Sequence, residues 1–167
     1  LKDLGYVNGH FGKWHLGDIG FHPENSGFDV NIGGNKHGGP GSYFAPYPYV
    51  KLENETKGEY LTDRIGDEVV KFIDINKENN FFAYVPFFSV HTPIQSKTDY
   101  QKKYRNKDSN EYHNRADYAG MIQSLDENVG KIIDKIDALN LSENTLIIFT
   151  SDNGGIRAIS DLSLIHI

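Results

Sequence analysis

Two long stretches of the chain carry hydrophobic residues at helical spacing. In residues 60–79 the apolar positions recur three or four residues apart: Leu61, Ile65, Val69, Phe72 and Ile73. In residues 115–139 a longer stripe does the same: Tyr118, Met121, Leu125, Val129, Ile132, Ile133, Ile136 and Leu139. Each pattern predicts an amphipathic helix with one buried face.

Shorter apolar runs predict strands. Residues 81–90 (FFAYVPFFSV) form a continuous run that predicts a buried strand despite Pro86. Residues 146–149 (LIIF) predict a second buried strand, which breaks into Ser151, Asp152 and Asn153. A brief strand is expected near Tyr6 and Val7.

The order strand, long helix, strand predicts a parallel pair, because a crossover of this length returns the chain to the same end of the sheet. The predicted fold class is therefore α/β, with a mostly parallel sheet flanked by helices. If the two buried strands are parallel, His91 and the Asp152–Asn153 pair emerge at the same edge of the sheet.

Residues 21–50 are rich in Gly, Pro, Asn and aromatic residues and show no periodicity that predicts an element. A loop of this length inside a compact domain is usually functional. Its aromatic residues fit either a stiff wall that stacks on a sugar or aryl group, or ordinary loop packing: Tyr43, Phe44, Tyr47 and Tyr49.

Composition narrows the classes of function. The 167 residues suffice for one domain, and the net charge of −6 argues against a general binder of nucleic acid or anionic membrane. An apolar run of about 18 residues, as a transmembrane helix needs, does not occur. The absence of cysteine excludes disulfides, thiolate metal ligands and a cysteine nucleophile from this stretch.

Three groups of polar residues are candidates for binding an anion or a metal ion. Lys13 and His15 are two apart, so in an extended segment both point to one face and suit an anion, although a solvated lysine beside a loop histidine fits the pattern too. Asp152 and Asn153 offer hard oxygen ligands for Ca²⁺ or Mg²⁺, or simply a turn. The basic stretch 97–107 suits a solvated face or an anionic substrate.

Three motifs occur in a specific order along the chain: GYVNGHFGKWHLG at residues 5–17, SVHTP at 89–93 and FTSDNGG at 149–155. With the long helix before the last of them, the chain resembles the formylglycine-dependent type I sulfatases of the alkaline-phosphatase superfamily, from about residue 1 to residue 157. The segments GFDVNIGG and GGPGSYFAPY also resemble the substrate loop of carbohydrate sulfatases.

The resemblance implies a role for each candidate residue in releasing inorganic sulfate from a sulfated carbohydrate. Lys13 would contact the sulfate oxygens and the aldehyde-derived nucleophile, and His15 would hydrogen-bond that nucleophile. His91 would bind the sulfate near the bridging oxygen and assist the departing alcohol. Asp152 and Asn153 would complete a Ca²⁺ site whose other carboxylates lie upstream.

The family makes its formylglycine nucleophile from Cys or Ser in a C/S-x-P/A-x-R segment, and residues 1–167 contain no such segment. Residues 1–160 are therefore expected to be the central part of a sulfatase catalytic domain, inactive in isolation. Residues 161–167 are expected to be a tail foreign to it. The resemblance also implies a formylglycine-generating maturation enzyme as partner and a periplasmic or secreted location.

Two other functions remain open from the sequence. A phosphatase, phosphodiesterase or phosphonate hydrolase of the same superfamily is one, although those enzymes more often use a two-metal cluster. The other is a non-catalytic glycan-binding homologue that uses the aromatic loop and the basic stretch without turnover. The upstream nucleophile segment would discriminate the enzyme from the binder.

Overall fold

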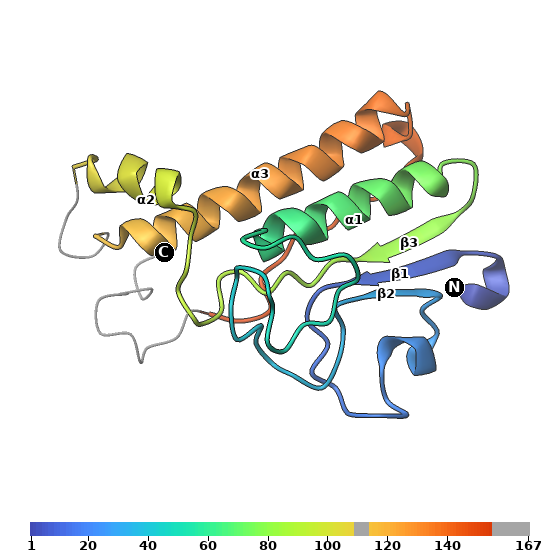
Figure 1. Ribbon diagram of the computed structural model, residues 1–167. Coiled ribbons are helices and arrows are strands. Elements are labelled where there is room, and N and C mark those ends of the chain that lie inside the picture. Colours follow the sequence, from blue (N-terminus) through green and yellow to red (C-terminus); the bar gives the residue numbers. More distant parts are fainter. Residues whose placement is uncertain (109–113, 155–167) are drawn as a thin grey trace.

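The computed structural model describes residues 1–108 and 114–154, and a three-stranded parallel sheet lies at its centre (Figure 1). The central strand is β1 (Val7–Phe11), with β2 (Val30–Ile32) on one side and β3 (Phe81–Tyr84) on the other. Gly9 is in register with Val30 of β2 and with Ala83 of β3. Because all three strands are parallel, their carboxyl ends meet at one edge of the sheet.

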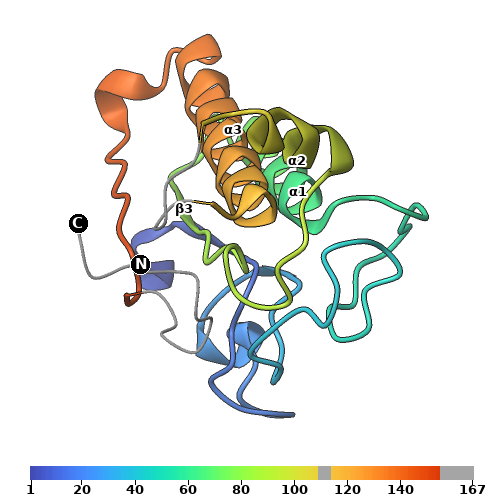
Figure 2. The same cartoon turned by 90° about the vertical axis from the view of Figure 1, so that its left-hand side faces the viewer.

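Helices cover one face of this sheet, as Figure 2 shows. The two predicted helices are confirmed as α1 (Leu61–Ile75) and α3 (Ala116–Ala138), which pack against each other. The short helix α2 (Thr98–Arg105) packs on α3. The described residues also contain single-turn 3₁₀ helices: η1 (Lys2–Leu4), η2 (Pro23–Ser26) and η3 (Ser142–Asn144).

Side chains alternate between the two faces of the sheet, as the pleat of a strand requires. Phe11 of β1 and Phe81 of β3 both pack on Phe72 of α1, with ring centroids 5.2 and 6.0 Å apart. On the opposite face the ring of His10 packs against Phe28 and Tyr84, at 5.5 and 5.7 Å. The strand pattern therefore builds an apolar core under the helices and an aromatic cluster under the loops.

The predicted strand over residues 81–90 is confirmed only in its first part, since β3 ends at Tyr84, and its predicted burial is wrong, since Phe82 and Tyr84 are exposed. Pro86, which has no N–H to donate to a neighbouring strand, follows two residues later. Strand β2 was not predicted, because three residues inside a glycine-rich segment are too few to show a period of two.

The prediction of a buried strand at residues 146–149 is wrong in this structure. The segment forms no strand, and its apolar side chains are largely exposed: Leu146 by 84%, Ile147 by 49%, Ile148 by 77% and Phe149 by 75%. Within the described part of the chain, β3 pairs with β1 alone, so the parallel pair expected of these two segments does not form. A strand needs both a hydrogen-bonded neighbour and a covered face, and these residues have neither.

The basic stretch expected to be a solvated face or an anion site is largely helix α2. Its half-buried Lys97 forms an ion pair with Asp63 of α1 at 2.9 Å and lies over the ring of Tyr100. This lysine therefore ties α2 to α1 rather than facing a ligand. The tail predicted at residues 161–167 lies outside the described residues, and among the residues that are described no helix is long and apolar enough to cross a membrane.

Candidate active site

The loops that follow β1 and β3 leave the carboxyl edge of the sheet side by side. The backbone N–H of Lys13 donates to the carbonyl oxygen of Pro86 at 2.8 Å, just beyond the end of β3. On the other side, the N–H of Gly12 donates to the carbonyl of Ile32 at the end of β2, also at 2.8 Å. Lys13 is thereby fixed at the edge of the sheet where ligands bind in open α/β folds.

Gly12 is required for this close approach. Its φ of +125° lies in a region that side chains rarely adopt, and a Cβ there would overlap the carbonyl oxygen of Pro86. The glycine that precedes Lys13 therefore lets the two loops lie in contact.

His15 is exposed and has a φ of +58°, an uncommon backbone conformation for a residue with a side chain. Its N–H donates to the carbonyl oxygen of Asn35 at 3.0 Å, which holds the loop after β1 against the segment after β2. Strained conformations of this kind are found where function fixes a side chain.

His91 is oriented by its own loop. Its Nδ1–H donates to the carbonyl oxygen of Thr92 at 2.9 Å, which leaves Nε2 to exchange a proton with a ligand. The buried Tyr43 supports the same loop. Its hydroxyl lies 2.6 Å from the carbonyl oxygen of Phe88 and 2.9 Å from that of His91. Burial raises the pKa of Tyr43, so this hydroxyl stays protonated and can donate to the loop.

Two consecutive glycines bring His15 and His91 together. A Cβ at Gly38 would lie 2.6 Å from the ring of His15, and a Cβ at Gly39 would lie 3.1 Å from Nδ1 of His91. Both rings therefore contact one short piece of backbone. Lys13 is two residues from His15, and within the described residues its amine makes no hydrogen bond or ion pair. Two of the three predicted catalytic residues, His15 and His91, thus lie around one loop, and Lys13, two residues before His15, adds a cation available to an anion.

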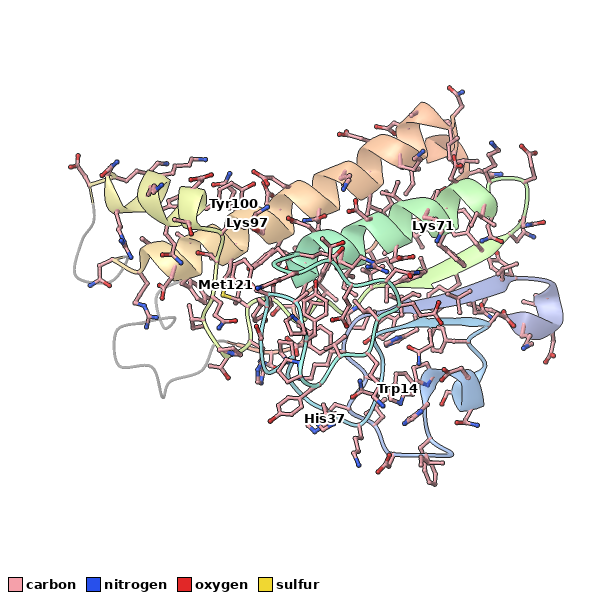
Figure 3. All side chains as sticks on the ribbon, in the orientation of Figure 1. Trp14, His37, Lys71, Lys97, Tyr100 and Met121 are labelled. Carbon is pink, nitrogen blue, oxygen red and sulfur yellow. The ribbon has the colours of Figure 1, made fainter. Side chains whose placement is uncertain are left out.

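His10 was missed by the sequence analysis. Its fully buried ring donates from Nε2 to the carbonyl oxygen of Lys13 at 3.2 Å, and it packs edge-on against Trp14 at 5.2 Å. Figure 3 shows Trp14 and His37 on the loop side of the sheet, away from the helices. The alternation of side chains along β1 could have predicted that His10 faces the loops. It could not have predicted the contact between His10 and Lys13.

The structure does not bring the predicted metal ligands into this group. Asp152 and Asn153 are exposed, and among the residues that the structure describes Asp152 Oδ1 accepts the neighbouring N–H of Asn153, at 2.9 Å. No cluster of three or more His, Cys, Asp or Glu with metal-binding spacing occurs in residues 1–108 and 114–154. The two side chains therefore fit Ca²⁺ in kind, as hard oxygen donors, but not in number.

Comparison with known proteins identifies the family of this chain. The family model "Sulfatase" matches residues 1–159. A sulfatase of Formosa agariphila is 41% identical over 108 residues, which cover 58% of this chain and 20% of that protein. The N-acetylgalactosamine-6-sulfatase of Mus musculus is 30% identical over 176 aligned positions, covering 92% of this chain and 32% of that protein.

A solved structure shows the same architecture. The crystal structure of Ps i-CgsB in complex with k-i-k-neocarrahexaose superimposes with a TM-score of 0.74 and 31% identity, over 94% of this chain and 39% of that one. The chain thus spans 20–39% of the length of these relatives. Because the family model matches nearly all of its residues, the chain belongs to the sulfatase family.

Proposed function

We propose that the protein to which this chain contributes hydrolyses sulfate esters of carbohydrates and releases inorganic sulfate. The observation that carries the proposal is the convergence of His15 and His91 on the Gly38–Gly39 backbone, with Lys13 two residues before His15 and fixed at the carboxyl edge of the sheet by its bond to Pro86. Membership of the sulfatase family supports the same reaction.

Each residue has a task that its geometry permits. The Lys13 amine neutralises negative charge on the peripheral sulfate oxygens, which lowers the cost of bringing a nucleophile to the sulfur atom. His91 hydrogen-bonds the bridging oxygen through Nε2. When the S–O bond breaks, the protonated Nε2 gives its proton to the departing sugar oxygen, so that an alcohol leaves rather than an alkoxide. After the transfer the sulfate is esterified to one hydroxyl of the hydrated aldehyde. His15 hydrogen-bonds the second hydroxyl and accepts its proton, so that the C–O bond to sulfate breaks, the aldehyde forms again and inorganic sulfate leaves.

Asp152 and Asn153 would hold Ca²⁺ together with ligands from outside the described residues. The ion would supply a second positive charge toward the sulfate oxygens. The nucleophile itself is proposed to be a formylglycine encoded before residue 1 and produced by a maturation enzyme. A periplasmic or secreted location is part of the same proposal.

A sulfated sugar is the preferred substrate class. One relative is named for N-acetylgalactosamine 6-sulfate, and the structural neighbour was crystallised with a neocarrahexaose. The phosphatase and phosphonate hydrolase alternatives have less support, since the relatives named above are sulfatases and no two-metal cluster is present in the described residues.

The test uses the complete parent protein, purified after co-expression with a formylglycine-generating enzyme and supplied with Ca²⁺. Galactose and N-acetylgalactosamine 4- and 6-sulfates and carrageenan oligosaccharides are offered in parallel with the matching sugar phosphates. Release of sulfate, measured by ion chromatography, supports the proposal. Release of phosphate from the sugar phosphates, with none of sulfate, would contradict it.

A further inference from the structure

A pocket of about 410 Å³ opens at Gly38 and Gly39, the residues that contact His15 and His91. Its walls include His37, Gly38, Gly39, Tyr49, Thr92 and Pro93. The volume falls within the range of small-molecule sites in proteins. No acidic residue is among those that line it, so the pocket does not repel an anionic sugar.

The two aromatic residues of this pocket form a stacked pair. The ring centroids of His37 and Tyr49 are 4.7 Å apart and their planes differ by 16°. Tyr49 is 49% exposed, whereas Tyr43 and Tyr47 of the same loop are buried with their hydroxyls bonded to backbone carbonyls. Of the four aromatic residues that the sequence offered as a sugar-binding wall, Tyr49 is therefore the one that lines this pocket.

A single side chain fixes both members of the pair. Asn35 Oδ1 accepts the backbone N–H of His37 at 2.8 Å, and Asn35 Nδ2 donates to the carbonyl oxygen of Tyr49 at 2.9 Å. The stack is thus built before a ligand arrives, which lowers the entropy cost of binding.

The pair lies directly beside the residues proposed to bind sulfate. His37 directly precedes Gly38 and Gly39, which contact the rings of His15 and His91. The aromatic wall therefore adjoins the backbone against which the two catalytic rings lie. Thr92 and Pro93, the two residues that follow His91, line the same pocket as the stack. A sugar ring attached to a sulfate at His91 would then lie in this pocket.

We propose that the stacked rings of His37 and Tyr49 form the wall that binds the sugar ring bearing the sulfate ester. Pyranose C–H groups pack against the aromatic surface, as apolar groups do on aromatic side chains. The inference rests on the proposed function and goes beyond it, because it assigns recognition of the sugar, as distinct from the sulfate, to two named residues.

The test compares recognition of the sugar with recognition of the head group in the complete parent protein. The variants are Tyr49→Ala, His37→Ala and Tyr49→Phe, with Tyr104→Ala on α2 as a matched tyrosine away from the pocket. For each, kcat/KM is measured with the sulfated sugar that wild type turns over fastest, and Ki with inorganic sulfate as competitive inhibitor. A thermal melt shows that each variant is folded.

We expect Tyr49→Ala and His37→Ala to lower kcat/KM by roughly tenfold, mainly through KM, with the Ki of sulfate unchanged. Tyr49→Phe, which keeps the ring, and Tyr104→Ala should match wild type. Alanine variants within twofold of wild type overturn the inference. So does a parallel rise in the Ki of sulfate, because the pair would then only position the histidines. A wild type that releases no sulfate from any sugar overturns the proposed function as well.

Discussion

The buried ring of His10 holds the backbone of Lys13, with Nε2 3.2 Å from the Lys13 carbonyl oxygen. The carbonyl can only accept, so Nε2 carries the proton and Nδ1 does not. Nδ1 is buried and has no hydrogen-bond partner among the described residues. A second proton on this ring would be a buried charge, and the nearby Asn31 and Glu24 offset the cost of its burial only in part.

Burial lowers the pKa of His10 from its ordinary value of 6.5. The unfolded chain takes up a proton near pH 6.5 that the folded ring resists, so acid favours unfolding. The contribution of His10 to stability is complete above pH 6.5 and is lost as the pH falls toward the lower pKa of the folded state. We expect the urea midpoint of the parent protein to fall between pH 7.5 and pH 5.5.

His10→Phe keeps an aromatic ring among Trp14, Phe28 and Tyr84 but cannot titrate. The variant should be less stable than wild type at pH 7.5 by about 1 kcal/mol, because the Lys13 carbonyl loses its donor. Its urea midpoint should depend less on pH in this interval. An equal pH dependence in both proteins would show that other groups cause the acid sensitivity.

Gly66 of α1 lies against the buried side chain of Asn128 of α3, and a Cβ at this position would overlap the amide of that residue. Asn128 is fixed by hydrogen bonds to Asp63 Oδ1 at 2.9 Å and to the Ser124 carbonyl at 2.8 Å, so it cannot move aside without losing them. Gly66→Ala should destabilise the fold by about 1 to 3 kcal/mol, although alanine favours helix.

Gly130→Ala on α3 is the matched control, since a Cβ added at this position would meet nothing within 4 Å. It should stabilise the protein by about 0.5 to 1 kcal/mol. Chemical denaturation of both variants measures the difference. If Gly66→Ala also stabilises, α1 and α3 are not packed as closely as described.

Asp152 and Asn153 are proposed Ca²⁺ ligands that the described residues do not complete. In the parent protein Ca²⁺ should raise the melting temperature, because an ion that binds only the folded state stabilises it. Asp152→Ala and Asn153→Ala should remove most of this increase, whereas Asp99→Ala, whose carboxylate is 90% exposed on α2, should retain it. An increase that survives in both site variants would place the ion elsewhere.

His91→Ala tests proton transfer to the leaving group. Turnover of a sulfated sugar should fall by about 100-fold or more, since a sugar alkoxide is a poor leaving group without a proton. Turnover of a nitrophenyl sulfate, whose phenolate leaves unaided, should fall much less. Equal losses on both substrates would indicate that His91 binds sulfate and donates no proton.

The sequence predicted those parts of the fold that follow from local periodicity. Both predicted helices form, and α1 and α3 pack against each other. The predicted stripe of α1 is buried, whereas in α3 only Met121 and Ile136 of the predicted stripe are buried, beside the polar Ser124 and Asn128. The run at residues 146–149 shows the limit of the same reasoning. Its composition is that of a buried strand, but a strand also depends on a neighbour, and composition does not say which neighbour is present.

The sequence also identified some of the residues of the candidate site, but not all of them. Lys13, His15 and His91 were identified from short motifs. The structure brings His15 and His91 to the Gly38–Gly39 backbone, and Lys13 lies two residues before His15. The contributions of Asn35 and His37 could not be predicted, because they arise from hydrogen bonds and stacking between loop segments far apart in the chain.

The role of Lys13 is decided by the rate of sulfate release from the complete parent protein and from its Lys13→Ala variant. Lys71→Ala, an exposed lysine on α1 that Figure 3 labels on the helical side, is the control. We expect wild type and Lys71→Ala to release sulfate from a sulfated sugar at equal rates, and Lys13→Ala to be slower by about 100-fold or more. Wild-type rates in Lys13→Ala would remove this residue from the mechanism and contradict the proposed site.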